Sequence, residues 1–88
     1  MMCGGFKAPS EATEAIQSMI DSFKSQVEAK LAANFSNFKA KTYTTQVVAG
    51  TNYKVIVGVD SDLEIEVVIY EPLPHTGSPK ELSNARYI

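Results

Sequence analysis

The chain has 88 residues, of which 44% are hydrophobic and 20% charged, and its formal net charge is −2. A chain of this length forms one small domain, so we expect a single domain over residues 1–88. The slightly acidic balance supplies no basic field for nucleic acid or anionic lipid, and no apolar stretch is long enough to cross a bilayer. We therefore expect no nucleic-acid partner and no membrane partner.

Residues 1–12 have the composition of a flexible arm. They include Gly4, Gly5 and a proline, and they show little periodicity. They also lack the apolar run of a secretory signal peptide. Cys3 is the one cysteine of the chain, so no intramolecular disulfide can form, and a free thiol is typical of the cytoplasm. A cytoplasmic location is therefore predicted.

The next segment has the periodicity of an amphipathic helix. Apolar residues recur there at spacings of four, three, four and four: Ile16, Ile20, Phe23, Val27 and Leu31. Thr13 is placed to cap the helix, and Glu14 suits its positive first turn. The pattern predicts one helix of about twenty residues that ends around residue 33 and packs one apolar face on a sheet.

The rest of the chain has the two-residue alternation of strands. Two strong strands flank a polar turn at residues 60–62 and predict an antiparallel hairpin; their inward residues are Tyr53, Val55, Val57 and Val59, then Leu63, Ile65, Val67 and Ile69. Residues 38–48 predict a weaker strand with Tyr43, Thr45 and Val47 on one face, although Lys41 interrupts its alternation. Residues 82–88 predict a weak last strand. The predicted fold class is α+β, with one long N-terminal helix packed across a four- to five-stranded antiparallel sheet.

Catalysis and metal binding have little support in the sequence. A nucleophilic dyad would have to use the lone His75 and Cys3, and Cys3 lies in a glycine-flanked arm that is ill suited to fixed geometry. A metal site needs three or four converging ligands. We expect no enzyme activity, no metal and no cofactor.

Three segments carry exposed small or apolar residues where a purely structural protein would not need them. They are the arm with Gly4-Gly5, the predicted hairpin tip Val47-Val48-Ala49-Gly50, and the connection Leu73-Pro74-His75. In an antiparallel sheet the two connections lie at the same end, and the arm can reach that end from the start of the helix. Together they predict a narrow apolar ridge that could enter a cleft on a partner.

These residues resemble the cystatins, which are reversible inhibitors of papain-like cysteine proteases. Gln46-Val47-Val48-Ala49-Gly50 matches the Gln-x-Val-x-Gly signature of that family, and Leu73-Pro74-His75 and Met1-Met2-Cys3-Gly4 extend the match. A chain without a signal peptide or paired cysteines is similar to the stefins, the intracellular type 1 branch. Members usually continue through a longer final strand, so the last strand is expected to be short or missing here.

The resemblance implies a function and a set of contact residues. An arm and two hairpin loops would form a wedge that blocks the active-site cleft of a cathepsin-type protease, by competitive and noncovalent inhibition. The implied protease-binding residues are Cys3, Gly4, Gly5, Gln46, Val47, Val48, Ala49, Gly50, Leu73, Pro74 and His75.

Alternatives remain open at this point. Cys3 is either a thiol without a task or an apolar contact of the arm, and His75 is either an ordinary loop residue or a contact at the rim of the cleft. The alternative for the whole chain is a non-inhibitory interaction module that forms domain-swapped homodimers, with the first hairpin loop as the hinge.

Overall fold

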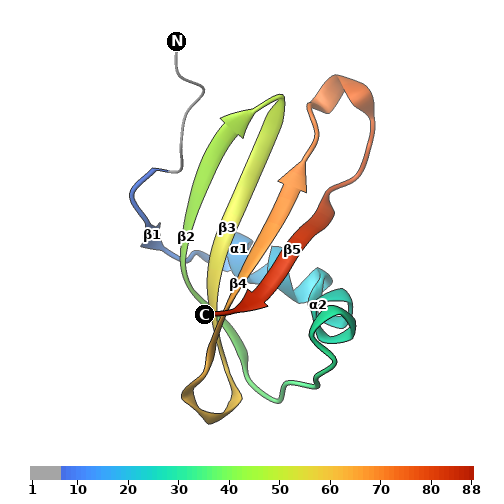
Figure 1. Cartoon of the computed structure of the whole chain (residues 1–88). Coiled ribbons are helices and arrows are strands. Elements are labelled where there is room, and N and C mark those ends of the chain that lie inside the picture. The colour runs from blue at the N-terminus through green and yellow to red at the C-terminus, as the bar shows by residue number, and fades with distance from the viewer. Residues whose placement is uncertain (1–6) are drawn as a thin grey trace.

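A computed structural model describes residues 7–88 and shows two helices on one face of a five-stranded sheet (Figure 1). The elements in chain order are β1 (Ser10–Glu11), α1 (Glu14–Ser22), α2 (Lys24–Leu31), β2 (Phe38–Val48), β3 (Gly50–Val59), β4 (Glu64–Glu71) and β5 (Glu81–Tyr87). Neighbouring strands in the sequence are neighbours in the sheet, and every pair is antiparallel. The predicted α+β class is confirmed.

The predicted single helix is divided in two at Phe23. Thr13 caps α1 as expected, because its Oγ1 accepts a hydrogen bond of 3.3 Å from the Ile16 amide. At the other end of α1 the Ser22 hydroxyl donates to the Met19 carbonyl at 2.6 Å. Such a bond from a serine to a preceding carbonyl competes with the helical ladder and bends helices. The bend allows α1 to pack against β2 while α2 packs against β5.

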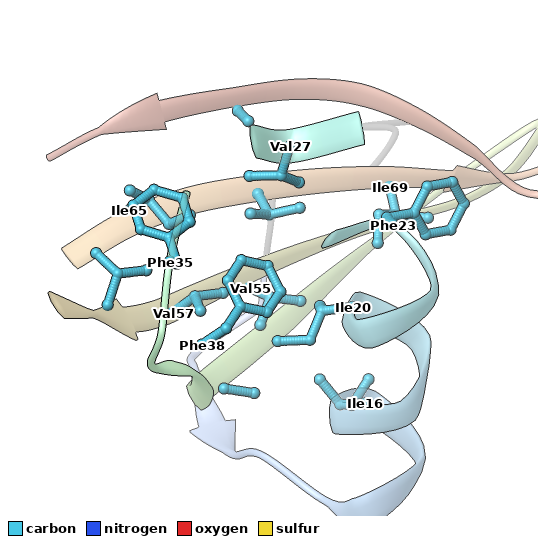
Figure 2. Close-up of a cluster of buried hydrophobic side chains, with 14 residues drawn as sticks. Ile16, Ile20, Phe23, Val27, Phe35, Phe38, Val55, Val57, Ile65 and Ile69 are labelled. Carbon is cyan, nitrogen blue, oxygen red and sulfur yellow. The ribbon is translucent and has the colours of Figure 1, made fainter. Parts of the chain in front are cut away.

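The core lies between the two helices and the concave face of the sheet. Figure 2 shows the buried helix side chains directed at valines and isoleucines of β3 and β4. The fully buried side chains are Ile20, Val27, Val55, Val57, Ile65, Val67 and Ile69. At about 25 cal/mol per Å² of apolar area, this burial is the main stabilising contribution to the fold. The alternation in the sequence therefore identified the core positions of both central strands with one exception: Leu63 was expected to face inward, but it lies before β4 and is 51% exposed.

The outer edge of β2 is covered by the chain that precedes the helix and by one helix side chain. Ser10 and Glu11 pair with Tyr43 and Thr42, so these arm residues form a short strand, contrary to the prediction of an unstructured arm up to residue 12. Further along, the Gln17 side chain occupies the place of a strand. Its Nε2 donates to the Phe38 carbonyl at 2.9 Å, and its Oε1 accepts from the Ala40 amide at 2.8 Å.

The interruption at Lys41 is a β-bulge. Ala40 pairs with Val57 and Thr42 pairs with Ile56, so Lys41 is the extra residue on β2. Its side chain reaches across β3 at Gly58 and its Nζ lies 2.7 Å from Glu64 Oε2 on β4. The bulge keeps Phe38 and Ala40 on the core face together with Tyr43, which explains why simple alternation failed at this point.

The last strand is present, so the expectation of a missing strand is wrong. β5 runs over seven residues and pairs with β4 from Tyr70 to Ile65, with an irregularity between Val68 and Ile69. Ala85 faces the core, and the Arg86 guanidinium lies beside the Glu66 carboxylate at 3.0 Å. Few apolar residues in β5 point inward, which is why its sequence pattern is weak.

Candidate functional site

The first loop is the closed tip of the hairpin formed by β2 and β3. The two strands pair as far as Val48 and Gly50, so Ala49 alone lies outside the ladder. Val47 is 60% exposed and Val48 is 38% exposed. Gly50 has φ = 118°, a conformation that favours glycine, and a Cβ at this position would lie 2.5 Å from the Glu71 carbonyl oxygen. Glycine at position 50 is what permits so tight a turn against β4.

The second loop follows β4 and lies at the same end of the sheet as the first loop (Figure 1). Pro74–Thr76 forms a single 3-10 turn, in which the Thr76 hydroxyl donates to the Leu73 carbonyl at 2.8 Å. Leu73 is 39% exposed, and Pro74 and His75 are exposed beside it. The two predicted connections thus present apolar side chains at one end of the molecule.

Both loops are attached to the last two residues of β4. The Tyr70 hydroxyl donates to the Ala49 carbonyl at the tip of the first loop. On the opposite face of the strand, Glu71 Oε1 accepts from the Tyr53 hydroxyl at 3.0 Å. Glu71 Oε2 lies 3.5 Å from Lys80 Nζ, at the far end of the second connection. The end of β4 therefore contacts the tip of the first loop and the far end of the second connection.

Electrostatics at this end of the sheet is mild. Partial burial and the hydrogen bond to Glu71 raise the pKa of Tyr53 above its usual value of 10.0, so the phenol stays protonated and continues to donate. Residues 7–88 contain no group of three or more histidines, cysteines or carboxylates that could hold a metal ion. Within the same residues, no helix has the length and apolar character needed to span a membrane.

The structure brings most of the predicted site residues together. Gln46 lies at the base of the first loop, where its Oε1 accepts a 3.1 Å bond from Asn52 Nδ2. Val47 to Gly50 and Leu73 to His75 form the two loops at one end of the sheet. Cys3, Gly4 and Gly5 lie outside the described residues. The described chain starts at Lys7, whose amide donates to the Thr45 carbonyl at 3.2 Å, three residues before Val48.

Sequence reasoning missed the residues that support the loops. Tyr70 and Glu71 continue the alternation of β4, so they are indistinguishable from ordinary strand residues in the sequence. Their role depends on the register that pairs Tyr70 with Asn52 and Glu71 with Thr51. A tyrosine in the last positions of a strand that faces a predicted glycine turn is the one signal that could have indicated the contact.

Comparisons with known proteins agree with this arrangement. The model of the Cystatin domain family matches residues 4–85. The chain is 44% identical to Cystatin-B of Oplegnathus fasciatus, over 99% of this chain and 87% of the relative. It is 42% identical to Stefin-C of Bos taurus, over 92% of this chain and 80% of the relative. Among solved structures it is similar to a secreted type 1 cystatin from Fasciola hepatica, with a TM-score of 0.78, 26% identity and coverage of 97% and 96% of the two chains.

Proposed function

Because the chain belongs to the stefin branch of the cystatin family, a family of cysteine-protease inhibitors, we propose that it is a reversible, competitive and noncovalent inhibitor of papain-like proteases of the cathepsin type. The partner in this proposal is the active-site cleft of the protease. No catalytic residue is needed in the inhibitor.

The observation that carries the proposal is the pair of exposed apolar loop tips at one end of the sheet. Val47, Val48 and Leu73 are 60%, 38% and 39% exposed, and all three project from closed turns. A specific interface covers roughly 800 Å² on each partner, and exposed apolar groups on a narrow ridge are typical of such a surface. Valine and proline lose little side-chain freedom on binding, which favours affinity.

The proposed contact residues follow the sequence prediction. Gln46 to Gly50 form the first inserted loop, Leu73 to His75 form the second, and Cys3, Gly4 and Gly5 form the contacting part of the arm. The closed shape of the first loop supports inhibition without cleavage. Val48 pairs with Gly50 across the turn, so the backbone does not offer an extended peptide bond to the catalytic thiolate.

We also propose an intracellular location, in line with relatives named Cystatin-B and Stefin-C. The similar structure from Fasciola hepatica is described as secreted, so location is tested separately from family membership. Fractionation of the source cells tests the proposal directly: recovery of the protein only from the medium would contradict it.

The function is tested by titrating a papain-type protease with purified monomer while a fluorogenic peptide is cleaved. Val48→Asp is expected to raise the inhibition constant at least about tenfold, because a carboxylate would have to be desolvated in the cleft. Leu63→Asp is the matched control, since Leu63 is an exposed apolar residue at the other end of β4. Its inhibition constant should equal that of the wild type.

Two outcomes would contradict the proposal. A folded monomer that inhibits no papain-type protease would exclude the function. Equal losses for Val48→Asp and Leu63→Asp would exclude the loops as the contact surface.

A second candidate rests on the same tight turn. Ala49 is the one residue of this hairpin outside the ladder. If the turn opened, β2 and β3 would form one continuous strand, and two copies could exchange the part of the chain that precedes the turn. The resulting domain-swapped dimer would lose the first loop and hence inhibition. Size-exclusion chromatography after mild heating separates the two forms, and a dimer that inhibits fully would contradict this candidate.

A further inference from the structure

The contact between β4 and the first loop goes beyond the support that a hairpin ordinarily receives. Val48 and Gly50 already pair across the turn, so the hairpin is closed by its own backbone. Tyr70 adds a bond from a third strand, because its hydroxyl donates to the carbonyl of Ala49, the residue outside the ladder. The tip is therefore contacted by a side chain 21 residues further along the chain.

The ring of Tyr70 also occupies the space next to Gly50. A Cβ placed on Gly50 would lie 2.8 Å from the Tyr70 hydroxyl oxygen and 2.9 Å from its Cε1 atom. The ring thus contacts the bare backbone of the glycine, and Gly50 is buried beneath it although it sits at the tip of a hairpin. The tyrosine and the glycine form one complementary pair.

We propose that Tyr70 is a positioning residue for protease inhibition. Its hydroxyl holds the Ala49 carbonyl and its ring packs on Gly50, so that Val47 and Val48 are presented in the conformation that enters the cleft. This inference rests on the proposed function and extends it to a residue outside the loops. Tyr70 acts through the first loop and needs no contact with the protease.

The proposal has a specific kinetic consequence. If the loop is held in its binding conformation, every molecule is ready to bind. If the loop exchanges among conformations, only the fraction of molecules in the binding conformation can bind. Removing the hydroxyl therefore slows association in proportion to that fraction. Dissociation of the formed complex is unchanged, because no contact with the protease has been lost. Loss of a direct contact acts mainly on the dissociation rate instead.

The experiment compares Tyr70→Phe with the wild type and with Tyr87→Phe. Tyr87 is an exposed tyrosine on β5 that pairs with Ile65, at the end of the sheet away from the loops, so the control removes the same atom elsewhere. A single neutral hydrogen bond corresponds to about a two- to tenfold change in an equilibrium constant. We expect Tyr70→Phe to raise the inhibition constant by that factor through slower association, and Tyr87→Phe to leave it unchanged.

A second readout does not depend on inhibition. In the free protein, the carbonyl ¹³C shift of Ala49 should change in Tyr70→Phe, and the ¹⁵N order parameters of Val47 to Gly50 should fall. The shifts of the core amides should stay the same in both variants. These measurements report on the loop even if no protease is inhibited, so a failure of the proposed function is distinguishable from a failure of the positioning role.

Three results would overturn the inference. Unchanged order parameters together with an unchanged Ala49 shift would show that the hydroxyl does not hold the loop. If the wild type inhibits and Tyr70→Phe associates with the protease at the same rate, then holding the loop does not matter for binding. Faster dissociation with unaltered loop dynamics would assign Tyr70 to direct contact with the protease.

Discussion

Asp60 joins two connections at the end of the molecule away from the loops. Its carboxylate accepts hydrogen bonds from the Ser36 amide at 2.8 Å and the Asn37 amide at 2.6 Å, and these bonds lower its pKa below the usual 3.8. The native state therefore binds a proton less readily than the unfolded chain. The resulting stabilisation is complete above a pH of about 4 and disappears as the pH falls through the lowered pKa.

The lowered pKa of Asp60 leads to a prediction about stability at different pH values. Asp60→Asn removes the charge, so at pH 7 the variant should have a lower free energy of unfolding than the wild type. The difference should shrink as the pH falls below about 4, because the wild-type carboxylate then becomes protonated as well. Urea unfolding at a series of pH values from 7 to 2 measures this difference in the free energy of unfolding. Asp62→Asn is the charge-matched control in the same turn. A difference that stays constant over this range would contradict the assigned bonds.

At the scale of the element, Gln17 connects α1 to β2. Its amide group bonds to the Phe38 carbonyl and the Ala40 amide, and its Nε2 also donates to Asp21 at 2.9 Å. Gln17→Leu keeps the size of the side chain but leaves the two backbone groups without this partner. We expect a loss of about 1–3 kcal/mol in the free energy of unfolding.

The matched control for this change is Gln26→Leu, because Gln26 is exposed on α2. It should change stability by less than about 0.5 kcal/mol. Hydrogen exchange provides a local check, since the Ala40 amide should exchange faster in Gln17→Leu alone. Equal effects of the two substitutions would mean that the amide bonds to β2 contribute nothing.

Elements were predictable from the sequence where local pattern determines them. The predicted strands at residues 53–59 and 63–69 carry an apolar residue at every second position, and the structure confirms both except at Leu63, which lies before β4 and is exposed. The break at Phe23 lies beside a hydrogen bond from the Ser22 hydroxyl, and the bulge at Lys41 depends on pairing with β3, so neither is visible as a pattern. The apolar tips of the loops were predicted because exposed valines are conspicuous, whereas Tyr70 was missed because its partner is set by strand register.

At the scale of the whole molecule, stability depends on one small core that lies away from the loops. Ile20 is fully buried between α1 and the sheet. Ile20→Ala should cost about 2–5 kcal/mol, a large share of the roughly 5–15 kcal/mol available to a small domain. Leu63→Ala, at a 51% exposed position, should cost less than about 0.5 kcal/mol.

Urea unfolding at neutral pH measures both changes. The fraction of Ile20→Ala that remains folded should inhibit as the wild type does, because the loops are held by the end of β4 rather than by the helix. An inhibition constant that worsens in step with stability would show that core and loops are coupled.

The cover on β2 has a consequence for a shortened chain. Residues 7–12 shield the backbone of Lys41, Tyr43 and Thr45. Trimming as far as residue 12 exposes these groups as a template for other chains. Gln17 lies inside a helix and continues to shield Phe38 and Ala40. A variant that lacks residues 1–12 is therefore expected to associate with other copies through the uncovered part of β2 more readily than the full chain does.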